Sequence, residues 1–289
     1  MQNTQETDLG TDVFRVGSNL EERLCTGLEE QLEEHLLVLP DERVERVRDA
    51  ERLLEIGLVQ LVGEDRRAFG DGMYLITGGY AAIAVDFKDH ITIVESGQSE
   101  ARGLAIIAEA KRLIPNKPIK YVVNTHCHID HSSGLRAAVA EGATILTHQL
   151  NKAYLEKTLS VPHSINPDEA QKNGRKPVVE AVVGEKKVLT DGTRTIELHH
   201  LQKFGHHDGM LVVYLPKEKI LLEADGYNPQ PATATPPSPP SPFTVSLADN
   251  IARLKLDVQR IVPVHLPADN RVVTMAELAK WIGRAAPTH

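Results

Sequence analysis

A short run rich in histidine carries the clearest chemistry in this sequence. His126, His128, Asp130 and His131 directly follow the apolar residues 121–123, where a strand would end and a loop could present side chains. Alternation in an extended segment places His126 and His128 on one side, and the turn beyond brings Asp130 and His131 to a neighbouring position. Imidazole nitrogen and carboxylate oxygen are ligands that suit zinc. The run therefore predicts two adjacent metal sites.

Four residues do not complete two metal sites, because a catalytic zinc site keeps three protein ligands and leaves one position for water. The best candidates for the missing ligands are His206, Asp225 and His265. Each lies at the end of a predicted strand or in the loop beside one. One such residue alone would be explained as a solvent-exposed side chain at the end of a strand, whereas the ordered set of seven residues indicates a metal centre.

The order of these residues resembles that of a known family. The H-x-H-x-D-H run is followed by Gly205-His206, by Leu222-Glu223-Ala224-Asp225 and by Val262-Pro263-Val264-His265. Together they resemble the motifs of the metallo-β-lactamase superfamily, over roughly residues 58–289. The resemblance implies an α/β fold, a four-layer αββα sandwich, and a centre of two zinc ions, for which manganese or iron could substitute.

The resemblance also implies a division of the seven ligands. One metal would be held by His126, His128 and His206, and the other by Asp130, His131 and His265. Asp225 would bridge the two ions.

Two positions depart from the usual pattern of this family. Glu95 stands where the family usually has an aspartate in a turn that supports the site, and His207 stands near the place of a Thr or Ser. His207 is expected to contact substrate or to face solvent. Tyr227 and Asn228 lie just past Asp225 and could reach a substrate carbonyl or carboxylate, although a Tyr-Asn-Pro turn explains them equally well.

The remaining histidines and Cys127 have simpler explanations. A lone histidine such as His148 or His163 is usually hydrogen-bonded or solvated. His199 and His200 are expected to be ordinary strand residues. Alternation places Cys127 away from His126 and His128, so we interpret it as a small packed residue.

The elements that position these residues alternate between strands and helices. β-rich runs and glycine turns predict strands, and longer amphipathic runs predict helices. The predicted strands are 58–62, 73–77, 81–87, 90–94, 119–124, 144–147, 178–183, 195–200, 210–215, 219–223 and 261–264, and the predicted helices are 100–113, 133–140 and 246–256. The two halves of this region have similar successions of strands and helices, which indicates a layered α/β arrangement with two facing sheets.

Two segments stand apart from this alternation. Residues 1–57 contain leucines every four residues, from Leu20 to Leu36, separated by glutamates, which predicts a helical arm before a hydrolase domain at 58–289. We interpret the arm as a packing or dimerisation element, so a homo-oligomer is one expected assembly. The proline-rich segment 236–242 predicts an exposed, stiff loop.

Composition narrows the class of partner. The chain has 289 residues, 41% hydrophobic and 25% charged, with a formal net charge of −8, which gives no electrostatic reason to expect nucleic acid or a membrane surface. A small-molecule substrate is expected. The N-terminus lacks the features of a signal peptide, and Cys25 and Cys127 offer no disulfide framework, so the sequence predicts a cytoplasmic protein.

The expected function is metal-dependent hydrolysis. Two ions roughly 3.5 to 4 Å apart can share a water, lower its pKa towards about 7 and supply hydroxide, with Asp130 orienting the water. A carbonyl substrate is favoured: a β-lactam, a lactone, another ester or a thioester. The alternatives are a phosphoester hydrolase of the same fold and a non-catalytic metal-binding module. Redox chemistry at a di-iron centre ranks low, because relatives of that kind tend to have Glu in place of His128.

Overall fold

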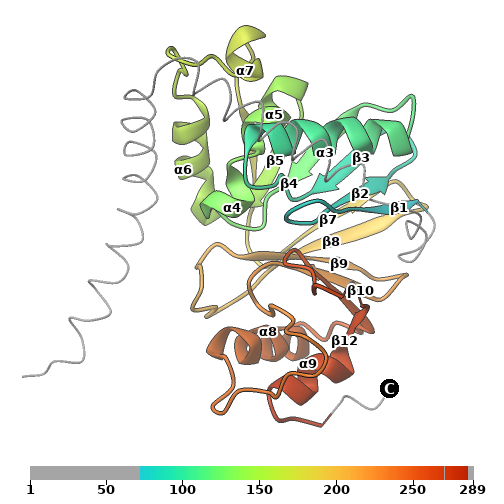
Figure 1. Ribbon diagram of the computed structural model, residues 1–289. Helices are drawn as coiled ribbons and strands as arrows, with labels where there is room; N and C mark the ends of the chain where they lie inside the picture. Colours follow the sequence, from blue (N-terminus) through green and yellow to red (C-terminus); the bar gives the residue numbers. More distant parts are fainter. Residues whose placement is uncertain (1–71, 270, 286–289) are drawn as a thin grey trace, which may run out of the picture. The chain divides into compact units, whose positions relative to one another are not determined.

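The fold is a sandwich of two mixed sheets with helices on both outer faces, seen in a computed structural model that describes residues 72–269 and 271–285 (Figure 1). The predicted αββα class is thereby confirmed. The predicted strand 58–62 and the helical arm 1–57 lie outside the described residues, and so does the boundary between arm and domain. None of the described helices is long and apolar enough to cross a membrane.

The first sheet has the strand order β1-β2-β3-β4-β5-β6. Its strands are β1 (Met73–Ile76), β2 (Ala82–Asp86), β3 (Ile91–Val94), β4 (Ile119–Val123), β5 (Thr144–His148) and β6 (Val178–Val182). The first three strands pair antiparallel, and β3 to β6 pair parallel. The parallel strands therefore end at the same edge of the sheet.

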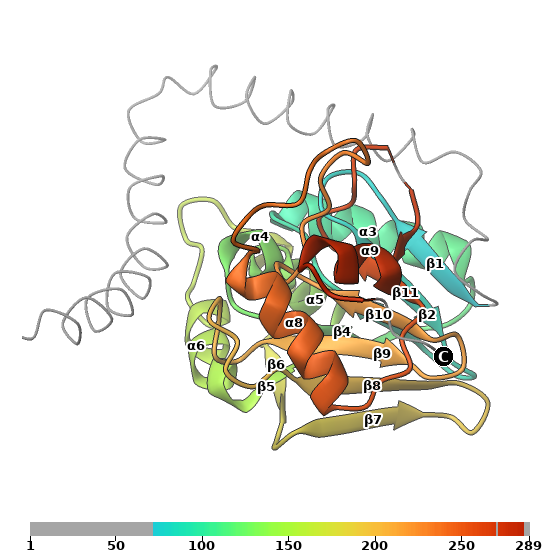
Figure 2. The same cartoon turned by 90° about the horizontal axis from the view of Figure 1, so that it is seen from below.

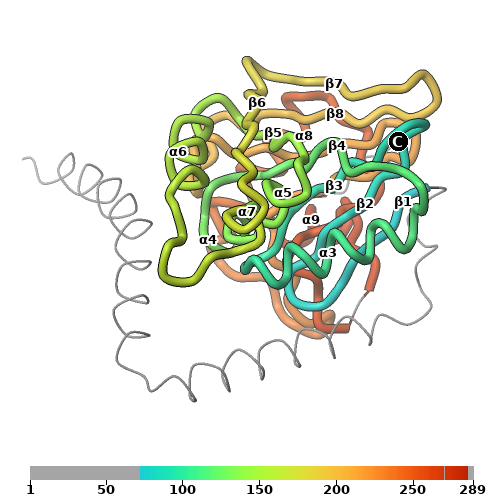
Figure 3. Tube along the Cα trace, turned by 90° about the horizontal axis from the view of Figure 1, so that it is seen from above, coloured from blue at the N-terminus to red at the C-terminus, as the bar shows by residue number. Residues whose placement is uncertain are grey.

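The second sheet has the order β12-β11-β10-β9-β8-β7. Its strands are β7 (Lys186–Thr190), β8 (Thr195–His200), β9 (Leu211–Leu215), β10 (Ile220–Glu223), β11 (Arg260–Pro263) and β12 (Val273–Thr274). Neighbouring strands pair antiparallel except β10 and β11, which pair parallel. Figure 3 shows both sheets from above, with β7 at the far edge.

Helices cover the two outer faces. α3 (Glu100–Leu113), α4 (Ile129–Ser132), α5 (Leu135–Glu141), α6 (Gln149–Leu159) and α7 (Glu169–Lys172) lie on the side of the first sheet. α8 (Pro242–Arg253) and α9 (Met275–Trp281) cover the second sheet (Figure 2). The layers are thus helix, sheet, sheet, helix.

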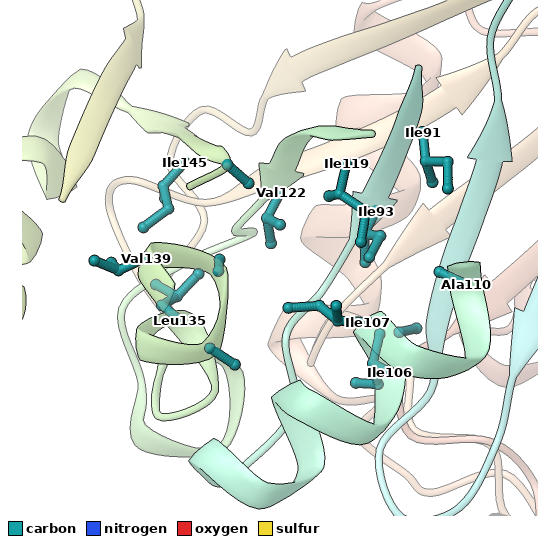
Figure 4. Packing of buried hydrophobic residues seen from close by; sticks show 14 of the residues in the cluster. Ile91, Ile93, Ile106, Ile107, Ala110, Ile119, Val122, Leu135, Val139 and Ile145 are labelled. Atoms are coloured by element: carbon teal, nitrogen blue, oxygen red, sulfur yellow. The ribbon is translucent and has the colours of Figure 1, made fainter. Parts of the chain in front are cut away.

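Each pair of adjacent layers has its own apolar core. The first lies between the first sheet and its helices, where Ile93, Val122 and Ile145 face Ile106 and Leu135 (Figure 4). The second fills the space between the sheets, and the third packs the second sheet against α8 and α9. Burial of apolar area in three successive layers fixes both sheets as one scaffold.

The structure adds elements to those predicted and shifts several boundaries, most of all that of α8, which was predicted at 246–256 and spans Pro242–Arg253. β7, β12, α4, α6, α7 and α9 were not predicted, while α3 begins and ends at the predicted residues. The predicted proline-rich loop ends one residue earlier than expected, because Pro242 is the first residue of α8. That position suits proline, since the first helical residue has no intrahelical partner for its amide.

Candidate metal centre

The ends of neighbouring strands bring the seven predicted ligand residues together. His126 follows β4, His128 caps α4, and Asp130 and His131 lie in α4. His206 lies in the loop between β8 and β9.

Asp225 follows β10, and His265 follows β11, the strand that pairs parallel with β10. These loops all leave the same edge of the sandwich.

Asn124 shapes the loop that carries the histidine run. Its side chain is fully buried, and its Nδ2 donates to the backbone oxygens of His126 at 2.6 Å and His131 at 3.0 Å. One amide thus bonds both ends of the run and curls it into a compact turn. The histidine and carboxylate side chains project from this turn.

The seven side chains form two groups that share one residue. The first group is His126, His128, His206 and Asp225, and the second is Asp130, His131, Asp225 and His265. Within each group one ligand atom per residue lies within 4.8 Å of all the others. This is the division that the family resemblance implies. A ligand role for these residues stays a prediction.

The Asp225 carboxylate is the point on which both groups converge. Its Oδ2 lies 3.2 Å from His126 Nε2, 3.0 Å from His131 Nε2 and 3.2 Å from His206 Nε2, and its Oδ1 lies 2.7 Å from His265 Nε2. Burial alone would raise the pKa of Asp225, but these four imidazoles outweigh it and hold the pKa far below its usual range. The residue is therefore a carboxylate.

The four Nε2 atoms around Asp225 are better placed to bind a metal ion than to hydrogen-bond with one another. Nε2 of His126, His131, His206 and His265 is buried, and none of the four makes a well-aligned hydrogen bond within the described residues. A buried polar atom without a partner costs about 1 to 3 kcal/mol. Neutral imidazoles around a carboxylate are the donor set of a borderline-soft divalent cation such as zinc.

Burial keeps two histidines of the first group, His126 and His128, in the neutral form that a metal requires. It lowers the pKa of His126 well below its usual value, against the opposing effect of Asp225. Burial also lowers the pKa of His128, and the nearby His206 adds to this effect. These imidazoles are therefore uncharged at neutral pH, with a lone pair available.

Glu95 supports the second group through both carboxylate oxygens. Its Oε1 accepts from the Thr125 backbone N–H at 3.0 Å, and its Oε2 lies 2.7 Å from His131 Nδ1. The residue is 1% exposed and has a φ of 71°. The hydrogen bond from Nδ1 leaves His131 Nε2 facing the group. The longer glutamate thus occupies the supporting position, despite its departure from the family pattern.

His131 itself is strongly affected by this environment. Burial alone would lower its pKa, but Glu95, Asp130 and Asp225 outweigh burial and raise the pKa to about 12. The carboxylates beside both nitrogens thus favour a protonated His131 in the metal-free protein, and a cation bound at Nε2 would take the place of that proton.

A glycine lets the supporting turn approach the helices. Gly134 N donates to Gly97 O at 3.0 Å, and a Cβ on Gly134 would lie 1.9 Å from the backbone oxygen of Ser96. Only glycine fits this approach. Ser96 Oγ in turn donates to His131 O, so the Glu95 turn and the α4 loop are bonded together.

Cys127 and His207 form a pair beside the first group. His207 Nδ1 accepts from Gly209 N at 3.0 Å, so Nε2 carries the proton and points to Cys127 Sγ at 3.1 Å. Burial lowers the pKa of His207 to about 4. Its ring centroid lies 5.5 Å from that of His126 and 5.4 Å from that of His128. His207 belongs to neither ligand group, and its contact with substrate stays a prediction.

Tyr227 does not fit the predicted substrate contact. The residue is 2% exposed and packs in the third core, and its hydroxyl donates to Glu277 of α9 at 2.8 Å. Its sequence position beside Asp225 suggested otherwise, but the chain turns inward there. Asn228 is exposed on the next position and remains a predicted contact.

The other histidines that were considered lie outside both groups. His148 stacks on His200 with ring centroids 3.8 Å apart, His163 lies 3.0 Å from Asp168, and His199 lies 2.8 Å from Glu197. Their partners account for them without a metal.

Three residues near the site were not singled out from the sequence. The ring centroid of Tyr80, in the β1–β2 turn, lies 4.4 Å from that of His265, and that of Phe243 in α8 lies 5.3 Å from that of His206. Glu223 is fully buried, its Oε2 accepts from the backbone N–H of Gly226 and Tyr227, and burial raises its pKa to about 8. The Gly78-Gly79 pair before Tyr80 was the available sequence indication.

Solved structures share this architecture. The DIM-1 metallo-beta-lactamase has a TM-score of 0.53 at 18% identity, covering 74% of this chain and 92% of its own. A metallo-beta-lactamase from Hirschia baltica has a TM-score of 0.52 at 18% identity, covering 76% and 96%. The FIM-1 enzyme from Pseudomonas aeruginosa, in its mono-zinc form, has a TM-score of 0.53 at 15% identity, covering 75% and 92%. At such identities the likeness shows the fold alone.

Sequence comparisons give a local relative and a family. A linear primary-alkylsulfatase of a Pseudomonas species is 37% identical over 57 residues, which are 20% of this chain, and the match spans only 11% of that relative's length. A family model described as the metallo-beta-lactamase superfamily matches residues 77–265, well over half of the chain. The chain belongs to the metallo-beta-lactamase superfamily.

Proposed function

We propose that this protein is a dinuclear metal-dependent hydrolase that acts on a carbonyl substrate, namely a β-lactam, a lactone, another ester or a thioester. The observation that carries the proposal is the pair of ligand groups that share Asp225. Two ions held in this way, zinc being the best suited, would supply an acidified water and polarise the substrate oxygen. Manganese or iron could occupy the same ligands.

The protein residues have separate tasks in this proposal. His126, His128 and His206 would hold one ion, Asp130, His131 and His265 the other, and Asp225 both. Glu95 orients the His131 ring through its hydrogen bond to Nδ1.

Asp130 is suited to accept a hydrogen bond from the attacking water. Its Oδ2 lies 3.3 Å from His131 Nε2 and 3.8 Å from His265 Nε2, and its side chain is 29% exposed. Burial would raise the pKa of Asp130, but the contact with His131 outweighs it and lowers the pKa, so the group is a carboxylate. A carboxylate here can orient the water and hold its proton.

A sulfate ester is a second candidate substrate. The observation that favours it is the local identity to the alkylsulfatase. A sulfate ester, like a carbonyl ester, offers an electrophilic centre beside an oxygen that can meet a metal. A phosphoester is the remaining alternative within the same fold, and a metal-binding module without activity is the alternative of a different class.

A substrate panel combined with metal analysis tests these possibilities. Purified protein loaded with zinc, manganese or iron would be assayed on a cephalosporin, a δ-lactone, a thioester, 4-nitrophenyl acetate, a phosphodiester and dodecyl sulfate. We expect about two metal ions per chain and turnover of a carbonyl substrate.

A matched pair of histidine variants gives the control. His126→Ala is expected to lose metal and turnover together, whereas His163→Ala, outside both groups, is expected to keep both. Two bound metals without turnover of any substrate would favour the binding module, and turnover that survives His126→Ala would refute the mechanism.

The cellular setting belongs to the same proposal. We expect a cytoplasmic protein that acts on a small molecule, with the arm 1–57 as the element through which copies would associate. Size-exclusion chromatography with light scattering on the full chain and on a chain that begins at residue 58 tests the last point.

A further inference from the structure

Tyr80 lies directly against the second ligand group. Its ring is parallel to that of His131, with an interplanar angle of 7° and centroids 5.9 Å apart, and meets the His265 ring edge-on at 4.4 Å. Both histidines belong to the group that contains Asp130 and Asp225. The tyrosine is half-buried, so one part of it packs on the imidazoles while another part remains accessible.

The backbone of Tyr80 is held firmly. A single nitrogen of Arg102, Nη2, donates to the carbonyl oxygens of Ile76, Thr77 and Tyr80 at 3.1 to 3.2 Å. Arg102 is 2% exposed, so these hydrogen bonds form away from water, where they are strong.

A second anchor ties the same turn to the second sheet. The Ala81 N–H donates to Val264 O at 2.9 Å, next to His265. The turn itself passes through Gly78 and Gly79, whose φ values of 109° and 85° favour glycine. Tyr80 is therefore fixed relative to the ligands rather than carried on a free loop.

The hydroxyl of Tyr80 stands out among the aromatic groups at the site. Within the described residues it makes no hydrogen bond, whereas the hydroxyl of the other tyrosine near the site, Tyr227, is committed to Glu277. The first ligand group also has an aromatic neighbour, Phe243, which carries no polar atom. The other ring beside the first group that bears a proton, His207, already directs its Nε2 to Cys127 Sγ. Near the second group, by contrast, the Tyr80 hydroxyl keeps a donor that no described residue uses.

We propose that the Tyr80 hydroxyl donates a hydrogen bond to the substrate oxygen that becomes negatively charged during hydrolysis, on the side of His131 and His265. The inference rests on the proposed function and adds a residue that determines how the substrate is oriented. The hydroxyl keeps its proton throughout, so it stabilises charge and transfers nothing. The Phe243 side would then receive the apolar part of the substrate.

The test compares two single-atom deletions. Tyr80→Phe removes only the hydroxyl, and Tyr74→Phe removes a hydroxyl from β1, where the ring packs on the first core. Each variant, loaded with zinc, would be measured for metal content, for kcat and KM on the panel substrate that the wild type turns over best, and for binding of inorganic phosphate by calorimetry. Phosphate serves as a tetrahedral oxyanion probe.

We expect Tyr80→Phe to keep its metals and to lose about tenfold to a hundredfold in kcat, with a smaller change in KM, because the hydrogen bond strengthens as negative charge develops. Its affinity for phosphate should fall by about tenfold. Tyr74→Phe should match the wild type in every measurement.

Each other outcome has a definite meaning. Unchanged kcat and unchanged phosphate affinity in Tyr80→Phe would overturn the inference and leave the proposed function standing. Loss of metal would also overturn it, because the hydroxyl would then act on the ligands. If the wild type hydrolyses no substrate, the proposed function fails, and weaker phosphate binding by Tyr80→Phe would still support the hydroxyl as a ligand-binding group.

Discussion

Glu95→Gln offers a sharp test of how the second ligand group is supported. The substitution preserves size and shape, and it exchanges one acceptor oxygen for an NH2 donor. In the protein both oxygens of Glu95 accept hydrogen bonds, one from the Thr125 N–H and one from the His131 Nδ1–H. A glutamine can satisfy only one of these donors, in either orientation of its amide.

The magnitude follows from that mismatch. The glutamine NH2 would face one of the two buried donors, the Thr125 N–H or the His131 Nδ1–H, and that donor would lose its hydrogen bond to the carboxylate. The free energy of unfolding of the metal-free protein should therefore fall by about 1 to 3 kcal/mol. The second group should also bind metal more weakly by about tenfold to a hundredfold, because the partner that orients its histidine is weakened. The first group contains no contact with Glu95 and should keep its affinity.

Two measurements check these values. Urea denaturation of the metal-free protein gives the change in stability, and titration of zinc against a competing chelator gives the affinity of each site. Glu156→Gln is the matched control, because Glu156 is a largely exposed glutamate paired with Lys152 on α6. If Glu95→Gln and Glu156→Gln have the same stability and the same two zinc affinities, the supporting role assigned to Glu95 is refuted.

Three further changes have defined outcomes. Asp225→Ala removes the one residue common to both groups, so elemental analysis should find less than one zinc per chain, and two retained zinc ions would contradict the shared role. Gly134→Ala places a methyl group against the Ser96 carbonyl oxygen, so the midpoint of thermal unfolding should fall by more than about 4 °C. An unchanged midpoint would mean that the backbone of the turn shifts at little cost to accept the methyl group.

Burial of Asp168 raises its pKa, but Arg136 outweighs burial and lowers the pKa below the usual 3.8. The Asp168 carboxylate therefore stabilises the fold above about pH 4, and this stabilisation is lost as the pH falls through the lowered pKa. The stability difference between wild type and Asp168→Asn, from urea denaturation, should therefore be smaller at pH 3 than at pH 7, and an equal difference at both would count against this account.

The sequence predicted much of the fold because strand ends and turns are encoded locally. The apolar run before His126 predicted β4 to within one residue, and the amphipathic stretch 100–113 predicted α3. β7 was missed because its alternation of Lys, Val and Thr leaves no strong apolar face, and its burial is correspondingly slight. Short helices such as α7 depend on capping by a single residue, Asp168, which is weak evidence in a sequence.

Residues around the site were harder to predict than the candidate ligands themselves. The candidate ligands follow one another in an ordered pattern, whereas the turn that carries Tyr80 is fixed at the site by Arg102, which binds Tyr80 O, and by Val264, which binds Ala81 N. These residues are far apart in the sequence. Tyr227 illustrates the opposite error, because proximity along the chain to Asp225 says nothing about which way a ring points after a left-handed residue. Asp225 has a φ of 58°, and the chain turns inward beyond it.

The shared position of Asp225 has a mechanical consequence for the sandwich. Each ligand group takes residues from both sheets. The loops after the first sheet carry His126, His128, Asp130 and His131, and the loops of the second sheet carry His206, Asp225 and His265. An ion bound by either group would cross-link the two sheets. Folding and metal uptake would then be linked equilibria, and the denaturation midpoint would rise with the concentration of free metal.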